Sequence, residues 1–340
     1  MKQGIGAILV GVFLVVALLL LSGFNRAKPR ILVMHSSDRN SSTVQRLDEG
    51  IHIALDRNRL PMFVRWHYLG IDHLPVEDLR QDAAKIGART IEQFDPDLVI
   101  AVDDEAQHYL MTRYGGHARP KVVFTAIDQE PAAYGYVGAG NVAGIVETLP
   151  LTAIRDTLLQ ARQGKPLRLA VIGSPGPTGQ GQSRQVQAYD WAPHQVVSVD
   201  SPADFATWQT TIQAMDGKVD ALLVLSCEGL TVSPLDARPV PPADIVHWIE
   251  ANAKPLPLGV SLSYVEMGGA LSVAPSARVM GEEATNLALA WVKAGTAAPP
   301  VFGQSNHYSV GIRATPLQAR QVVLPSIYIE AARLNRLYFP

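Results

Sequence analysis

Short apolar segments alternate with longer amphipathic stretches along most of this chain, and this alternation restricts its fold more than any other feature. Most of the apolar segments are continuous rather than alternating, as in strands that are covered on both faces of a parallel sheet. The expected strands begin at Ile31, Asp97, Lys121, Val142, Arg168, Ala221 and Pro257. The expected helices lie over 41–58, 76–94, 104–114, 151–163, 202–215, 242–253 and 277–294. This order predicts an α/β fold with doubly wound parallel sheets and right-handed crossovers.

The composition describes a folded chain with no nucleic-acid partner. Its 340 residues are 47% hydrophobic and 18% charged, which is enough to bury the cores of two modest lobes. The formal net charge of −2 gives no large basic field of the kind that binds phosphates. We therefore expect no nucleic acid among the partners.

The amino terminus carries a charge-free apolar run from Ile5 to Phe24. A run of about twenty residues is long enough to cross a bilayer as a helix. The residues before Ala27 and Gly23 do not form a good signal-peptidase site, because Asn25 and Leu21 stand where small residues are needed. We predict a single transmembrane anchor over residues 1–27, with a cleaved signal peptide as the alternative.

The rest of the chain is predicted to form two lobes with a hinge of three crossings. We expect lobe 1 to hold residues 28–130 and 256–298, and lobe 2 to hold 131–255 and 299–340. The crossings are placed near residues 144–150, near Pro255 and near Pro299. The glycine-rich stretch over 132–141 has no helical period and is interpreted as interlobe connection.

Ligands of open parallel sheets bind beyond the carboxyl ends of the strands, where helices begin and leave unpaired N–H groups. Polar residues gather at these positions in both halves of the sequence. The candidates for ligand contact are Ser36, Ser37, Asp103, Asp104, Thr125, Asp128, Ser174, Ser226, Glu228 and Tyr264. Glu147 and Thr148 are assigned to the hinge.

Each candidate also has a purely structural interpretation. Asp103 and Asp104 either hold a ligand amine or cap the helix that follows them. Ser36 and Ser37 either bind an anion at a helix amino end or close a turn. Tyr264 is expected to face the cleft, with its ring free to stack on an apolar ligand.

No catalytic residue, cofactor or metal site is predicted. Cys227 ends an apolar strand and is interpreted as a small buried hydrophobe. The stretch GSPGPTGQGQ over 173–182 lacks the nucleotide-binding spacing and is interpreted as a flexible loop. His35, His108 and His117 have no histidine four residues away on a helix, and no G-x-S-x-G sequence occurs.

Several segments resemble a known family. KVVFTAIDQEPAAYGYV, GNVAGIVETLPL, RLAVIGSPG and PLGVSLSYVEMGG are similar to segments of ABC-transporter substrate-binding proteins with the type I periplasmic-binding fold. The similar subgroup binds tryptophan and other amino acids, and the match covers nearly all of Ile31 to Arg333. ILVMHSSD and DLVIAVDDEAQHYL also resemble binding domains that are paired with sensor histidine kinases and diguanylate cyclases.

The resemblance implies a solute-binding protein without enzymatic activity. It implies hinge closure on a small molecule, an amino acid first, and presentation to an ABC permease or to a sensor kinase or cyclase in another chain. It also implies lobes in the periplasm, either tethered to the inner membrane or released after cleavage. Two alternatives stay open: an extracytoplasmic α/β enzyme, and a membrane-tethered interaction module that binds no ligand.

Overall fold

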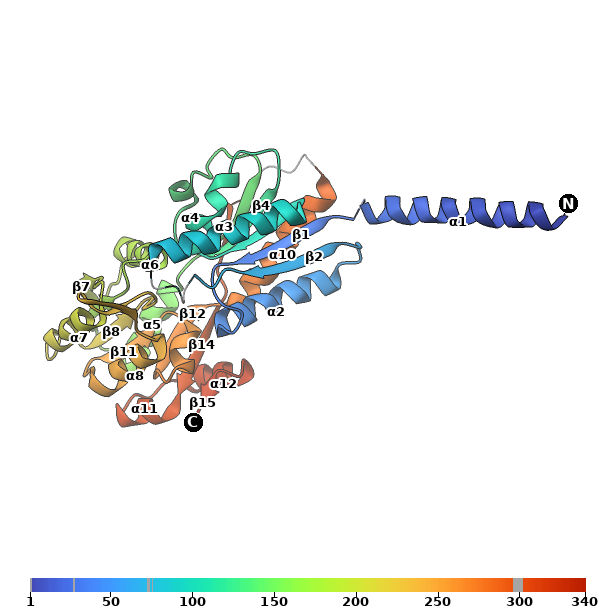
Figure 1. Ribbon diagram of the computed structural model, residues 1–340. Coiled ribbons are helices and arrows are strands. Elements are labelled where there is room, and N and C mark those ends of the chain that lie inside the picture. Colours follow the sequence, from blue (N-terminus) through green and yellow to red (C-terminus); the bar gives the residue numbers. More distant parts are fainter. Residues whose placement is uncertain (1, 27, 72–73, 75, 296–301) are drawn as a thin grey trace.

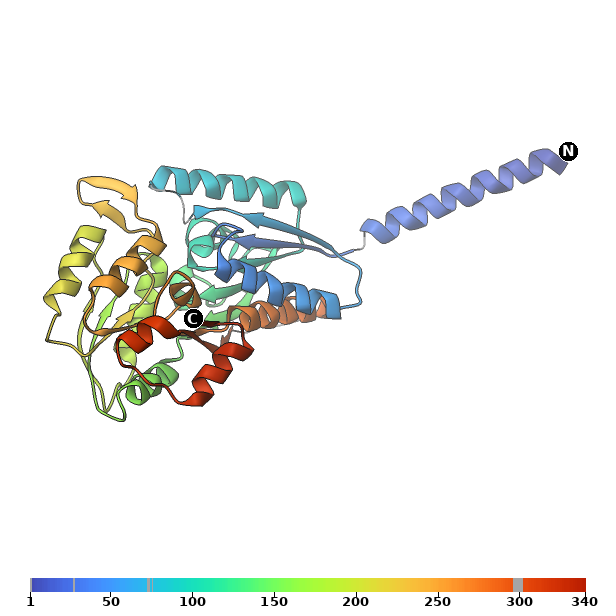
Figure 2. The same cartoon turned by 90° about the horizontal axis from the view of Figure 1, so that it is seen from below.

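The computed structural model describes residues 2–26, 28–71, 74, 76–295 and 302–340, with the side chains of 2–9 and 26 left out. Two α/β lobes lie next to each other, and helix α1 (Lys2–Arg26) extends from lobe 1 away from lobe 2 (Figures 1 and 2). Within the residues that are described, no helix combines the length and apolarity that a membrane crossing requires. The predicted anchor, from Ile5 to Phe24, begins among residues whose side chains lie outside the described part.

Lobe 1 is built on a six-stranded sheet in the order β13-β5-β4-β3-β1-β2, with every pair parallel. Helices α2 and α10 cover one face, and α3 with the short helices α4, η2 and η3 covers the other. The strands are β1 (Arg30–His35), β2 (Phe63–Tyr68), β3 (Leu98–Val102), β4 (Lys121–Ile127), β5 (Val142–Glu147) and β13 (Phe302–Ser305). The helices are α2 (Ser42–Arg57), α3 (Glu77–Phe94), α4 (Asp104–Tyr109), η2 (Met111–Tyr114), η3 (Pro131–Tyr134) and α10 (Ala277–Ala294).

Lobe 2 is built on a seven-stranded sheet in the order β15-β14-β12-β11-β8-β6-β7. All pairs are parallel except β12 with β14. Its strands are β6 (Arg168–Ile172), β7 (Gln195–Asp200), β8 (Ala221–Val224), β11 (Leu256–Gly259), β12 (Leu271–Pro275), β14 (Tyr308–Arg313) and β15 (Tyr338–Phe339). A separate hairpin joins β9 (Thr231–Ser233) to β10 (Asp236–Pro239).

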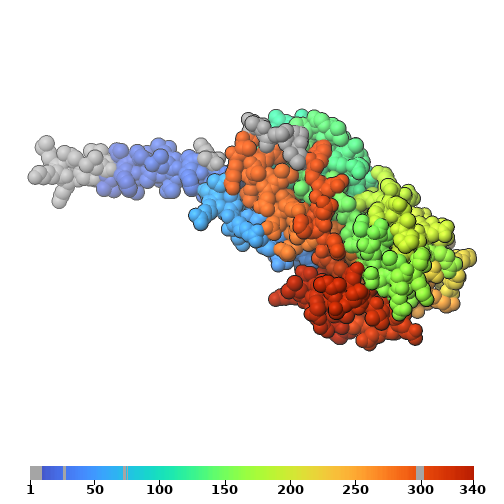
Figure 3. Space-filling model, turned by 180° about the vertical axis from the view of Figure 1, so that it is seen from behind, coloured from blue at the N-terminus to red at the C-terminus, as the bar shows by residue number. Residues whose placement is uncertain are grey.

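Helices also cover both faces of the lobe 2 sheet. Residues of α5, α11 and α12 enter one core, and residues of α7 and α8 enter the other. The C-terminal segment, dark red in Figure 3, packs against the body of this lobe. The helices are α5 (Leu151–Ala161), α6 (Pro177–Ala188), α7 (Phe205–Ala214), α8 (Pro242–Asn252), α9 (Leu262–Glu266), α11 (Ala314–Ala319) and α12 (Ser326–Leu334).

In the described part of the chain, the backbone passes between the sheets three times: from β5 to α5, from β12 to α10, and from β13 to β14. A three-crossing hinge and a crossing near 144–150 agree with the expectation. The predicted lobe boundaries were wrong, because β5 and β13 pair within the lobe 1 sheet while β11 and β12 pair within the lobe 2 sheet. Pro255 therefore does not mark a crossing. The stretch over 132–141 lies inside lobe 1 and joins β4 to β5, and most of the segment near Pro299 lies outside the described residues.

Candidate functional site

A cavity of about 140 Å³ lies between the two lobes, next to the carboxyl ends of strands from both sheets. We call it the interlobe cavity. Parallel strands place their carboxyl ends at one edge of each sheet, so residues far apart in the sequence meet there. The predicted site residues that line it are Ser36, Ser37, Asp103, Asp128, Ser226, Glu228 and Tyr264. That these side chains bind a ligand stays a prediction.

Asp103 lies at the junction of β3 and α4 with a backbone conformation (φ 81°, ψ 157°) that is essentially restricted to glycine. Its Oδ1 accepts a hydrogen bond from the Asp104 amide at 2.7 Å, and its Oδ2 accepts one from the Ser36 hydroxyl at 2.7 Å. The side chain therefore caps the helix, as one interpretation predicted, and also lines the cavity. The strained backbone places the Asp103 carboxylate in the lining of the interlobe cavity.

Asp104 is fully buried and does not line the interlobe cavity. Its carboxylate accepts hydrogen bonds from the backbone amides of Asp128 at 2.8 Å and Gln129 at 3.2 Å, and from the Tyr134 hydroxyl. The prediction that Asp104 contacts a ligand is therefore not supported by its position. Instead, it fixes the loop that carries Asp128.

Thr125 and Ser174 are also displaced from the predicted positions. Thr125 is fully buried, and its hydroxyl donates to the Met280 carbonyl at 3.5 Å, so it joins β4 to α10 inside lobe 1. Ser174 is buried beside a neighbouring hollow, where Glu105 and Arg80 also lie. Neither side chain lines the interlobe cavity.

Helix α6 belongs to lobe 2 and contacts lobe 1 through its side chains. The sequence over 173–182, which includes its first turns, was predicted to be a flexible loop. Pro177 occupies the first turn of this helix, where its fixed φ is favourable. Gln182 spans the interface: its Oε1 accepts from the Ser226 amide at 2.8 Å, and its Nε2 donates to Asp128 Oδ2 at 3.3 Å. Gln185 donates to the Glu147 carbonyl at 3.2 Å. These contacts hold lobe 2 against the acidic edge of lobe 1.

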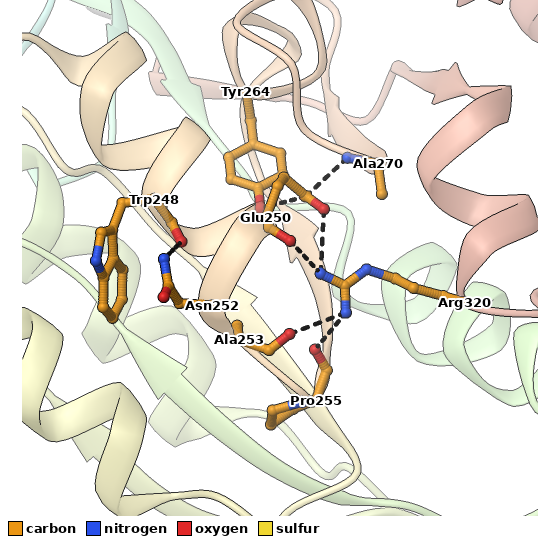
Figure 4. Close-up of polar contacts among 8 residues, drawn as sticks. All are labelled: Trp248, Glu250, Asn252, Ala253, Pro255, Tyr264, Ala270 and Arg320. Atoms are coloured by element: carbon orange, nitrogen blue, oxygen red, sulfur yellow. Dashed lines mark hydrogen bonds and ion pairs between the residues drawn. The ribbon is translucent and has the colours of Figure 1, made fainter.

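Tyr264 lines the cavity but has little freedom to stack on a ligand. Its side chain is 4% exposed, and its hydroxyl donates to Glu250 at 2.8 Å. Figure 4 shows that Glu250 also binds the Ala270 amide and Arg320, at 2.8 Å and 3.3 Å. This network of hydrogen bonds fixes the ring as part of the cavity wall.

Three lining residues were not singled out as ligand contacts from the sequence. Arg46 on α2 forms an ion pair across the lobes with Glu266 on α9. His35, at the end of β1, lies 2.8 Å from Asp48. Gln182 was missed because its segment was interpreted as a loop. Nothing in the local sequence around Arg46 distinguishes it from a solvent-facing helical arginine.

The hinge residue Glu147 places its side chain in the lining of the cavity, whereas Thr148 does not line it. Burial, together with the Asp103 and Asp104 carboxylates, raises the pKa of Glu147 to about 8. Burial and the carboxylates of Glu147, Asp104 and Asp103 also raise the pKa of Asp128 well above its usual range. These carboxylates repel one another, and Glu147, with a pKa of about 8, retains its proton at neutral pH.

Neither Cys227 nor the described acidic groups at this position have the properties of a thiolate nucleophile or a metal site. Cys227 is buried as predicted, and burial followed by the Glu228 carboxylate raises the pKa of its thiol to about 12, which disfavours a nucleophilic thiolate. Among these residues, no group of three or more histidine, cysteine or acidic side chains is placed to hold a metal ion.

The two lobes, the three crossings and the interlobe cavity define a protein with the type I periplasmic-binding-protein fold. Solved structures support this class. The chain is similar to an ABC domain from Streptococcus pneumonia in complex with L-Trp, with a TM-score of 0.64 and 15% identity over 89% of this chain and 98% of that one. It is also similar to a conserved domain protein from Vibrio cholerae, with a TM-score of 0.61 and 16% identity over 89% and 98%.

A third similar structure is the ligand-free, open form of a substrate-binding protein with adhesive properties from Clostridium difficile. Its TM-score is 0.60, with 15% identity over 88% of this chain and 96% of that one. The structural neighbours include ABC-transporter solute-binding proteins, and at these identities the likeness establishes the fold. No protein-family model and no curated protein sequence match the chain.

Proposed function

We propose that this protein is a solute-binding protein that captures a small molecule between its lobes. The closed, ligand-bound form is then recognised by a partner protein. The observation that carries this proposal is the interlobe cavity, which is lined by polar side chains at the strand ends of both sheets. A cavity shared by two lobes is a good ligand site, because a bound molecule can contact both at once. The fold of the structural neighbours supports the same function.

Closure is the proposed mechanism. A ligand that touches Asp128 in lobe 1 and Ser226 in lobe 2 binds the closed form more tightly than an open form, in which these residues are apart. Gln182 already joins the two positions by hydrogen bonds. Ligand binding therefore shifts the population towards the closed shape, which a partner protein can recognise.

The proposed partner is an ABC permease, with a membrane sensor kinase or cyclase as the alternative. The first ligand class we propose is the amino acids, because one structural neighbour holds L-Trp and because hydroxyl and carboxylate groups line the cavity. Solute-binding proteins of this kind carry out no turnover, so we assign no catalytic residue.

We further propose that α1 tethers the lobes to the periplasmic face of the inner membrane. Its described side chains are strongly apolar and exposed, among them Phe13, Leu18 and Leu20. The helix leaves lobe 1 on the side away from lobe 2 (Figure 1). A membrane that holds α1 would therefore lie away from the interlobe cavity. Tethering keeps the protein near its membrane partner. Full-length protein should stay with membranes after a carbonate wash, and its recovery in the soluble fraction would rule out the tether.

A thermal-shift screen of residues 28–340 tests the proposed function. A ligand at 100 times its dissociation constant should add about 2.7 kcal/mol to the free energy of unfolding. The library should hold amino acids, amines, sugars, nucleosides and organic acids. Gln182→Ala should reduce the shift of any hit, because it removes a bridge between the lobes.

Gln180→Ala is the matched control, because Gln180 lies on the same helix but is exposed, and its side chain donates to the Pro175 carbonyl within lobe 2. It should retain the full ligand-induced shift. A folded sample that shows no shift with any compound in the library would contradict the solute-binding function.

A further inference from the structure

The charges that line the interlobe cavity do not balance. Asp103, Asp128 and Glu147 are three carboxylates that line it from lobe 1. Among the described residues, none of the three forms an ion pair with a lysine, arginine or histidine. We call them the cleft carboxylates. Asp128 is buried, and Asp103 and Glu147 are half-buried. Carboxylates in such positions without a counter-charge are costly, and a cationic ligand would reduce that cost.

The two basic side chains of the lining already have acidic partners. Arg46 forms an ion pair with Glu266, and His35 Nε2 lies 2.8 Å from Asp48 Oδ1. Glu266 compensates the charge of Arg46 through Nη2, although the buried Nη1 of Arg46 has no hydrogen-bond partner among the described residues. A ligand carboxylate would therefore share the Arg46 guanidinium with Glu266 and would lie close to the cleft carboxylates.

Asp128 gives a second and independent sign that a ligand group belongs here. Its side chain is 7% exposed and lines the cavity. Its Oδ2 accepts a hydrogen bond from Gln182, whereas its Oδ1 is buried and has no hydrogen-bond partner. A buried carboxylate oxygen normally has a donor, so this atom is positioned to accept one from a ligand.

The size and the remaining lining narrow the ligand further. A cavity of about 140 Å³ is close to the size of an engineered cavity of about 150 Å³ that holds benzene. The cleft carboxylates share the lining with apolar side chains that include Val102, Val260 and Met280. These surfaces suit a molecule with a short hydrocarbon part and a positively charged group. A metal ion fits less well, because the described acidic groups are not arranged as metal ligands.

We propose that the interlobe cavity selects a small organic cation, whose ammonium group donates hydrogen bonds to Asp128 and is surrounded by Asp103 and Glu147. This inference rests on the proposed solute-binding function and narrows its ligand class. The proposal separates amines of net positive charge from zwitterionic amino acids, whose carboxylate would have to share Arg46 with Glu266 in the described lining.

A charge series at constant chain length tests the proposal by calorimetry on residues 28–340. The probes are 1,4-diaminobutane, 4-aminobutanoate and succinate, which carry charges of about +2, 0 and −2 at neutral pH. Lysine, leucine and tryptophan complete the set. We expect 1,4-diaminobutane to bind at least about tenfold more tightly than 4-aminobutanoate, and succinate not to bind.

Asp128→Asn should weaken binding of the diamine by about 30-fold or more, because it removes the carboxyl group whose ionised form the bound ammonium stabilises. Asp56→Asn is the matched control, since Asp56 is exposed on α2, and it should bind like the wild type. Circular dichroism confirms that each variant is folded. The charge series on the wild-type protein decides the question even if Asp128→Asn does not fold.

The outcomes separate the two proposals. Tighter binding of leucine, tryptophan or 4-aminobutanoate than of the diamine would overturn the proposal that the ligand is a cation. It would leave the solute-binding function in place. In that case Arg46→Ala should weaken binding of the zwitterion, because the ligand carboxylate would be held by the Arg46 guanidinium. No binding by any probe here and no shift in the wider thermal screen would overturn both.

Discussion

At the scale of single residues, the most consequential side chain is Glu147. It ends β5 at the first crossing between the lobes and shares the cavity lining with Asp103 and Asp128. Its pKa of about 8 exceeds its ordinary value of 4.5, so the folded, ligand-free protein binds a proton there that the unfolded chain has lost. The free energy of unfolding should therefore fall as the pH rises from 4.5 to 8.

Urea unfolding of ligand-free protein at pH 5 and pH 8.5 measures this effect. We expect Glu147→Gln to reduce the loss of stability between the two pH values by about 2 kcal/mol, because a neutral amide replaces a carboxylate that is hard to ionise. Glu49→Gln is the control, since Glu49 is exposed on α2, and it should leave the pH dependence unchanged. Equal pH dependence of stability in Glu147→Gln and wild type would contradict the raised pKa of Glu147 in the folded protein.

Only part of the site could be predicted from individual residues. The rule for strand ends correctly placed Asp103, Asp128 and Ser226 at the cavity. It could not show that Asp104, one residue further along, turns inward to bind backbone amides. Asp103 and Asp104 point in different directions because Asp103 has a positive φ, a conformation that aspartate tolerates poorly. No sequence pattern predicts this conformation.

At the scale of elements, burial explains which strands could be predicted. The central strands β1, β3 and β4 are buried along almost their whole length and appear in the sequence as continuous apolar runs. The edge strands β2 and β7 expose part of their length, and their sequences FVRWHY and QVVSVD carry no such run. Helix α6 was missed because glycine and proline dominate its first turns, although Gly181 is needed there for close packing.

The position of Gly181 leads to a prediction about α6. A β-carbon at this residue would lie 2.6 Å from the carbonyl carbon and oxygen of Asp128, across the interface between the lobes. Gly181→Ala should therefore destabilise the closed form by about 1–3 kcal/mol and weaken ligand binding roughly tenfold or more. The stability of the ligand-free protein should stay the same or rise by up to about 1 kcal/mol, because alanine favours the helix.

Calorimetry and urea unfolding measure the two effects of Gly181→Ala separately. Gly140→Ala is the matched control, because a β-carbon at Gly140 meets no atom within 4 Å and its φ is not positive. It should bind ligand like the wild type. Wild-type affinity in Gly181→Ala would show that closure against Asp128 is not part of binding.

At the scale of the whole molecule, the class of fold could be predicted but the division into lobes could not. The alternation of apolar and amphipathic segments in the sequence predicts two doubly wound sheets joined by a hinge. Sheet membership depends on pairing between distant segments, and α10 returns to lobe 1 and packs on α2 after β12 has completed its pairing in lobe 2. Nothing local in the sequence of β11 and β12 indicates which sheet they join.

The most direct test of the account is the distance between the lobes with and without ligand. Fluorophores on cysteines introduced at Glu92 of α3 and Thr210 of α7, with the buried Cys227 replaced by alanine, report this distance in single molecules. Saturation with the ligand that the thermal screen identifies should shift the population to the closed, compact state, and Gly181→Ala should reduce that shift. An unchanged distance distribution while calorimetry shows the ligand bound would contradict capture by closure of the two lobes.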